Sequence, residues 1–225
     1  MSEVAERLRR HGAGIGSAAL RKEDDRLLRG DGRFTDDVQP AHALHMAVGR
    51  CPFPHARVAR IDVSQAIALE GVRQVLAGAE IVALTEPISV LRPVPGAPKL
   101  PYYALAPEVC VFEGQPFVSV VATSRHVAED AVERVDVEWE PLPHVTDTLG
   151  ALEPDAPVLH PAQLPGNLLV SNPQGTDTAD AIADADVVVE DRFHVNRVTG
   201  LPMEPRAVVA EWRPGARMLT AHCST

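Results

Sequence analysis

Apolar and polar positions follow a strand pattern, then a helix pattern, in the first third of the chain. Leu44, Met46 and Val48 alternate with other residues, which is typical of a strand with one buried face. Gly71 ends the helical spacing that follows. The pattern predicts a strand near 44–48, a strand over 58–63, a helix over 64–70 and a returning strand over 72–76.

A second unit of the same kind begins at residue 117. The continuous apolar run 117–121 predicts a strand that is buried on both faces. Ser124 is suited to cap the helix that follows. Residues 135–139 then predict another strand, with Asp136 and Glu138 on the face opposite to its apolar side chains.

Two proline-rich stretches interrupt these units. Residues 87–107 predict a long loop, because proline cannot occupy the interior of a sheet, and such loops are usually functional or interfacial. Residues 141–165 predict an extended crossover between domains.

The last part of the chain shows shorter patterns. They predict a helix over 178–185, a strand over 187–195 and a hairpin of 207–212 with 218–223 around Pro214-Gly215. The final strand is followed by no turn, cap or polar tail, which leaves strand edges without cover. We therefore expect a fragment, or a subunit that another chain completes.

Composition narrows the class of protein. The chain has 225 residues, 45% hydrophobic and 23% charged, which is typical of a globular protein and excludes collagen, coiled coil and disorder. Its net charge of -10, without a basic stripe, would repel nucleic acid and anionic membranes, so neither is expected as a partner. No apolar stretch suits a membrane span or a signal peptide, and the expected location is the cytoplasm.

Glycine and cysteine patterns offer no cofactor site. Gly12, Gly14 and Gly16 are spaced like a dinucleotide loop, but the charged segment before them does not suit a strand, so a flexible arm is favoured. The three cysteines are odd in number and far apart, which argues against disulfides and an iron–sulfur cradle. Cys110 is interpreted as a small core residue.

Acidic and histidine pairs also have simple interpretations. His42 and His45, three apart on a strand, would lie on opposite faces and could not share a metal ion. The acidic pairs have no histidine or cysteine at ligand spacing and are interpreted as solvated turn residues; they are Asp24-Asp25 and Asp36-Asp37.

One turn motif remains ambiguous. Glu204 and Arg206 flank Pro205 just before a predicted strand. A structural ion pair is favoured over a substrate contact. The residues alone thus predict an acidic α+β chain with no catalytic residue and no metal site.

Several short motifs, taken in order, resemble one family of redox enzymes. Each is weak alone, but their order and spacing extend over residues 14–225. The first group is Gly14-Ile15-Gly16, Arg21-Lys22-Glu23-Asp24, Gly30, Gly32, Phe34 and Asp36-Asp37. The later groups are Pro54-His55-Ala56-Arg57, Gly114-Gln115-Pro116, Glu138-Trp139-Glu140-Pro141, Met203-Glu204-Pro205-Arg206 and Cys223-Ser224-Thr225. Together they resemble the molybdenum-binding large subunit of the xanthine dehydrogenase/aldehyde oxidase family.

This resemblance implies an α+β fold: an α/β hammerhead domain followed by the start of the first molybdopterin-binding domain. The expected division is an N-terminal arm over 1–19, the hammerhead over 20–145, a proline-rich linker over 146–165 and the incomplete cofactor domain over 166–225. In the family, a molybdenum-pterin cofactor hydroxylates an aldehyde or N-heterocycle-type carbon with oxygen from water.

The resemblance also implies partners. Electrons would pass to [2Fe-2S] clusters in a small subunit and to FAD in a medium subunit, and the rest of the large subunit would complete the cofactor site. The family's glutamine beside the molybdenum would follow Ser224-Thr225, so no catalytic residue is expected here and the chain alone should be inactive. Cofactor-binding residues stay unknown.

Two hypotheses follow from the resemblance. In the first, the chain is the N-terminal scaffold of such a subunit, and Tyr102 and Tyr103 in the first proline-rich loop line the channel of a small-molecule substrate; the alternative for them is anchoring the loop on the core. In the second, the chain is a non-catalytic fragment or assembly module from a split gene.

Overall fold

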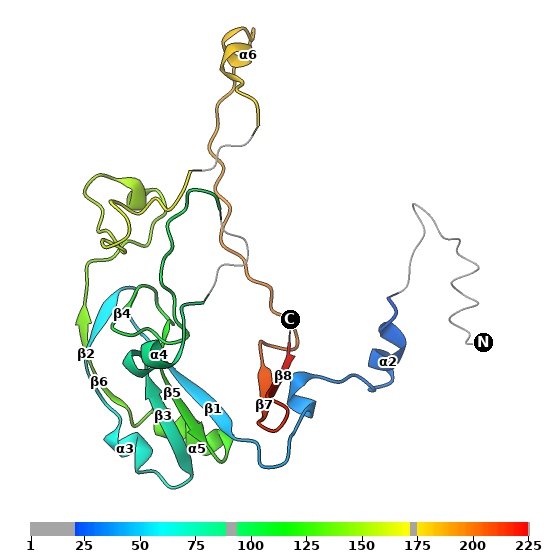
Figure 1. Ribbon diagram of the computed structural model, residues 1–225. Coiled ribbons are helices and arrows are strands. Elements are labelled where there is room, and N and C mark those ends of the chain that lie inside the picture. Colours follow the sequence, from blue (N-terminus) through cyan, green and yellow to red (C-terminus); the bar gives the residue numbers. More distant parts are fainter. Residues whose placement is uncertain (1–20, 89–93, 172–174, 225) are drawn as a thin grey trace, which may run out of the picture. The chain divides into compact units, whose positions relative to one another are not determined.

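A computed structural model describes residues 21–88, 94–171 and 175–224 (Figure 1). The chain divides into two units, one of residues 42–191 and the other of Met1–Ala41 with Arg192–Thr225. The predicted arm over 1–19, with its three glycines, lies outside the described residues.

The unit of residues 42–191 is built on two three-stranded antiparallel sheets. The first has the order β1 (His45–Arg50), β5 (Pro116–Ala122), β3 (Val72–Ala77). The second has the order β4 (Val109–Cys110), β2 (Ala56–Asp62), β6 (Asp136–Pro141). The strands predicted from the two strand–helix–strand patterns are therefore confirmed, and each pattern contributes strands to both sheets.

Three helices accompany these sheets: α3 (Ser64–Ile67), α4 (Gly78–Leu84) and α5 (Arg125–Val132). Helix α5 packs on β1 and β5. Ser124 Oγ accepts a hydrogen bond from Val127 N at 3.3 Å, which confirms the predicted cap. None of the helices in the described ranges has the length and apolar character that a membrane span requires.

Strand β5 forms the centre of the core. Val118 and Val120 are fully buried on one face and Phe117 and Ser119 are buried on the other, which confirms the prediction of a strand covered on both faces. Phe117 meets the ring of Trp139 edge-on, with centroids 4.9 Å apart. In β6, Asp136 and Glu138 are exposed while Trp139 packs against the core, so the predicted alternation is also confirmed.

Helix α4 is absent from the sequence prediction. Glu80 accepts a hydrogen bond from Ala77 N at 2.8 Å and so satisfies a free donor at the start of the helix. At Gly78 the backbone passes so close to another segment that an added Cβ would lie 1.7 Å from the Ala106 carbonyl oxygen. Only glycine permits this approach.

The second proline-rich stretch is locally ordered rather than simply extended. It contains the short helix η2 (Gly150–Leu152), and Leu164 is buried. The Asn167 side chain accepts from Leu159 N and donates to the carbonyl oxygens of Ala151 and Pro157. A short helix, α6 (Ala179–Ala183), follows within the predicted range 178–185.

The other unit contains α2 (Asp24–Leu28), η1 (Thr35–Asp37) and the strands β7 (Val208–Arg213) and β8 (Met218–Cys223). The two strands pair as the predicted hairpin, with a turn in which Arg217 N donates to Pro214 O.

The predicted strand over 187–195 is wrong. In the structure these residues belong to no sheet, and the side chains of Val187, Val189, Phe193 and Val195 are exposed. Alternation of apolar residues specifies which face of a strand would be buried, but a strand also needs a hydrogen-bonding neighbour. No described segment supplies one.

Candidate functional site

Two distant segments of the unit that contains the hairpin meet at Glu204. Thr35, which is buried, donates its backbone N–H to Glu204 Oε1 at 2.7 Å. The two residues are 169 positions apart in the chain. A carboxylate that accepts a hydrogen bond from a backbone N–H forms a charge-assisted bond. Glu204 therefore links the segment around Thr35 to the residues just before the hairpin.

Ser224 follows β8 and lies at the same open end of the hairpin, where it contacts the residues just before β7. Its hydroxyl accepts from Ala207 N at 2.6 Å and donates to Pro205 O at 2.9 Å. Its backbone N–H donates to Ala207 O at 3.1 Å. We call this group of five residues, Thr35, Glu204, Pro205, Ala207 and Ser224, the Glu204 junction. It fixes the backbone where the chain enters and leaves the hairpin.

The expected ion pair between Glu204 and Arg206 is not formed. Arg206 is exposed, and the Glu204 carboxylate bonds to Thr35 instead. Local spacing suggested Arg206 as the partner of the Glu204 carboxylate because the two residues are two positions apart, whereas Thr35 is distant in sequence. No signal in the sequence pairs Thr35 with Glu204.

The acidic pairs make local structural contacts. Asp24 forms an ion pair with Arg21, and Asp25 with Arg29, each at 2.8 Å on the surface. Asp37 accepts from Phe34 N at 2.8 Å. The solvated role expected for these carboxylates is confirmed, although Asp24 and Asp25 lie on α2 rather than in a turn.

The two histidines that were predicted on one strand are placed differently. His42 lies in the turn before β1 with a φ of 62°, and only His45 belongs to the strand. The prediction that they occupy opposite faces of one strand is therefore wrong. Within the described ranges, no group of three or more His, Cys, Asp or Glu side chains could hold a metal ion.

Cys51 and Cys110 are both buried, whereas Cys223 is exposed. Burial, and then the neighbouring Cys51, raises the pKa of the Cys110 thiol to about 12. A thiol that stays protonated is a poor nucleophile, so the prediction of a core role for Cys110 is confirmed.

The first proline-rich loop carries Tyr102 and Tyr103. Tyr102 is 39% exposed and stacks on Phe112, with ring centroids 6.4 Å apart and planes at 22°. Its carbonyl accepts from Ile88 N at 2.7 Å. Tyr103 is half-buried. The contact with Phe112 anchors Tyr102 while it leaves part of the ring accessible.

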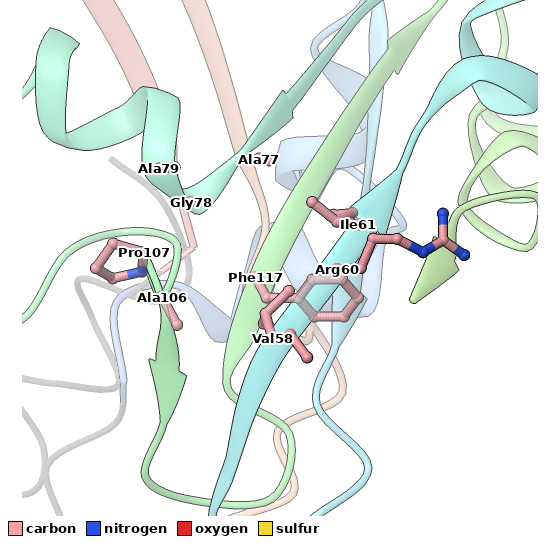
Figure 2. A pocket seen from close by; sticks show the side chains of 10 residues that line it. Val58, Arg60, Ile61, Ala77, Gly78, Ala79, Ala106, Pro107 and Phe117 are labelled. Carbon is pink, nitrogen blue, oxygen red and sulfur yellow. The ribbon is translucent and has the colours of Figure 1, made fainter. Parts of the chain in front are cut away.

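A small hollow of about 170 Å³ lies between β2, the start of α4 and the segment at Ala106-Pro107 (Figure 2). Its wall is mainly apolar and includes Val58, Ile61 and Phe117. Arg60 is the charged residue on its rim, and this guanidinium is paired with Asp136 on β6. The hydrogen bond to Asp136 raises the pKa of Arg60 further. The hollow therefore offers no acid, base or nucleophile.

Comparison with known families gives two consecutive matches. Residues 29–143 match the model described as aldehyde oxidase and xanthine dehydrogenase, a/b hammerhead domain, and residues 159–225 match the molybdopterin cofactor-binding domain. The chain belongs to the aldehyde oxidase and xanthine dehydrogenase family. The α+β fold expected from the motifs, a hammerhead domain followed by the start of a cofactor-binding domain, is confirmed.

Individual relatives support the same assignment. The chain is 36% identical, over 93% of its length, to the carbon monoxide dehydrogenase large chain of Afipia carboxidovorans. It is 34% identical, over 90% of its length, to the 6-hydroxypseudooxynicotine dehydrogenase complex subunit gamma of Paenarthrobacter nicotinovorans. The structure of quinoline 2-oxidoreductase from Pseudomonas putida 86 superimposes with a TM-score of 0.83 at 38% identity over 94% of the chain.

The chain spans about a quarter of the length of these relatives: 26% of each of the two sequences and 27% of the quinoline 2-oxidoreductase chain. Its described residues show no buried polar side chain left without a hydrogen bond, and the hollow beside β2, at about 170 Å³, is too small to enclose a pterin. These residues alone do not fit the whole cofactor, and no catalytic step is assigned to them.

Proposed function

We propose that the chain is the N-terminal scaffold of a molybdenum hydroxylase large subunit. The observation that carries this proposal is the order of its two family matches, a hammerhead domain followed by a molybdopterin cofactor-binding domain. The complete enzyme would hydroxylate an aldehyde or N-heterocycle-type carbon with oxygen from water. Names of relatives that include nicotine 6-hydroxylase and aldehyde oxidoreductase support this substrate class.

The proposal assigns the domains and partners as follows. The hammerhead occupies 20–145, the linker 146–165 and the start of the cofactor domain 166–225. The molybdenum-pterin cofactor would be enclosed with the rest of the large subunit, and electrons would leave through [2Fe-2S] and FAD centres in separate subunits. A subunit gamma and several large chains among the relatives support such a multi-subunit assembly. The cytoplasmic location stays a prediction.

The role of this chain's own residues is to hold backbone in place. The Glu204 junction fixes the backbone where the chain enters and leaves the hairpin, within the matched cofactor-binding segment. The buried core around β5 provides a rigid body on which the proline-rich loop is carried. Neither contribution requires a catalytic side chain.

Metal and pterin analysis of the assembly purified from the native host tests the function. We expect about one molybdenum per copy of this chain, together with flavin and iron–sulfur partners. A lone polypeptide without molybdenum would refute the proposal and favour the assembly-module hypothesis.

The channel role of Tyr102 and Tyr103 is a second, separable part of the proposal. In the complete enzyme, replacing both with alanine should change the ratio of kcat/KM between a small and a bulky substrate by roughly tenfold, since one pocket side chain typically changes discrimination by about 1–3 kcal/mol. Phe112→Leu, which removes the stacking partner but keeps both tyrosines, is the control for altered loop packing. Unchanged substrate ratios would show that the tyrosines serve only as anchors.

A further inference from the structure

The β7–β8 hairpin has one face made only of apolar side chains. In its antiparallel register, Val208 pairs with Cys223, Ala210 with Ala221 and Trp212 with Leu219. Directly opposed residues project to the same side of a sheet, and every second residue shares that side. We call these six residues, Val208, Ala210, Trp212, Leu219, Ala221 and Cys223, the hairpin face.

All six side chains of the hairpin face are exposed. Val208 and Trp212 are each 57% accessible, and Leu219 is 62% accessible. The opposite side of the hairpin carries the ion pair of Glu211 with Arg213, at 3.0 Å, and its central residues are partly buried. The usual arrangement, with the apolar side covered and the polar side in water, is reversed.

The segment before the hairpin has the same property. Phe193, Val195, Val198 and Leu201 are exposed, and Met203 is fully so. Monomeric proteins rarely expose contiguous apolar surface of this kind, and a lone two-stranded hairpin is marginally stable in water. This surface therefore requires a covering polypeptide.

We propose that the hairpin face is the docking surface for the polypeptide that forms the rest of the molybdopterin cofactor-binding domain. This inference rests on the proposed function. The family match to that domain covers residues 159–225, and the relatives are about four times as long as this chain, so they contain the additional polypeptide that the surface needs.

The shape of the face defines the chemistry of the occupant. Small side chains, Ala210 and Ala221, lie in the middle, between the larger pair Trp212 and Leu219 on the turn side and Val208 on the other. The occupant is accordingly an apolar element that places a bulky side chain over the two alanines, with Trp212 beside it. Buried aromatic anchors of this kind contribute most to binding in protein interfaces.

Hydroxyl-radical footprinting tests the proposal on the isolated chain and on the assembly purified from its host. We expect the oxidation rates of Trp212 and Leu219 to fall at least fivefold in the assembly. Trp139, packed between Phe53 and Phe117, is an internal control that should react equally slowly in both samples. Equal labelling of Trp212 in both would overturn the proposal.

A pair of neighbouring substitutions adds a matched comparison. Ala221 and His222 are both exposed but lie on opposite faces of β8. Ala221→Lys should reduce recovery of the assembly at least tenfold, whereas His222→Lys should leave it unchanged. Equal recovery of the two variants would contradict the assignment of the face.

The remaining outcomes are also decisive. Sedimentation that shows a dimer of the isolated chain with Trp212 already protected would assign the face to a second copy and overturn the proposal. A chain that purifies from its host without any other polypeptide would overturn it as well. Protection of Trp212 in an assembly that lacks molybdenum would uphold the docking surface while it refutes the proposed function.

Discussion

The sheet β1-β5-β3 and the hairpin β7–β8 are both antiparallel and both carry apolar side chains, yet they differ in what covers them. Val118 and Val120 in β5 are fully buried, because β5 has a strand on each side and α5 packs against it. Val208 in β7 is 57% exposed, and β7 has a single neighbouring strand, β8. The two strands therefore differ in burial because only β5 has a strand on each side and a helix packed against it.

The largest expected difference concerns two glycines, one in each unit. Gly78→Ala places a Cβ 1.7 Å from the Ala106 carbonyl oxygen, whereas Gly200→Ala meets nothing within 4 Å. We expect Gly78→Ala to lower the free energy of unfolding by about 3 kcal/mol or more, and Gly200→Ala to change it by less than about 0.5 kcal/mol. Urea denaturation followed by circular dichroism measures both, and similar values would contradict the comparison.

A matched valine pair gives the next largest effect. Val118→Ala removes two methyl groups from a fully buried site, and Val208→Ala removes the same groups from a half-exposed one. The expected losses of stability in the isolated chain are about 2 kcal/mol and below about 0.5 kcal/mol. If the hairpin face is covered in the assembly, the assembly that contains the Val208→Ala variant should dissociate at a higher protein concentration than the wild-type assembly. A dilution series measures this difference.

The Glu204 junction predicts a local effect. Glu204→Ala removes the acceptor of the Thr35 N–H, a bond to a charged group that contributes about 1.5 kcal/mol. Exchange of the Thr35 amide proton should accelerate roughly tenfold, as measured by NMR. Glu204→Gln, which keeps an acceptor oxygen, should have an intermediate effect, and Arg206→Ala none; acceleration in the Arg206 variant would show that the ion pair matters after all.

The smallest expected effect is a pH dependence in the unit of residues 42–191. Burial, and then the neighbouring His55, lowers the pKa of His160 below its usual 6.5. The unfolded chain then binds a proton at a higher pH than the folded chain, so this contribution to stability is complete above pH 6.5 and is lost as the pH falls toward the folded pKa.

Denaturation of wild type and His160→Gln between pH 5 and 8 measures this difference. The variant should lose stability less steeply below about pH 6.5 than the wild type does. Parallel curves for the two proteins would show that His160 does not contribute.

Sequence patterns anticipated the elements that depend on neighbours along the chain. The alternation in β6, the cap at Ser124 and the turn of the hairpin were all predicted, because each depends on residues within a few positions of one another. Helix α4 was missed, because its N-cap residue Ala77 is not the Ser, Thr, Asp or Asn that marks a helix start in a sequence, and only Glu80 contributes a capping bond.

The candidate site was predictable only in part. The order of motifs indicated the family, and the segment around Glu204 was singled out, but its partner was misassigned to Arg206. The apolar alternation over 187–195 was real, but it predicted a strand that has no described neighbour to pair with.

The sequence by itself determined the family, the two strand–helix–strand units and the two faces of each strand, since these follow from local periodicity and from the order of motifs. Only the tertiary structure decided that Thr35 meets Glu204, that Gly78 passes against Ala106 and that the apolar side of the hairpin is the exposed one. The physical reason is that backbone preferences and side-chain periodicity act over a few residues. Contacts between segments far apart in the chain depend on how complete elements pack, and local patterns do not encode that packing.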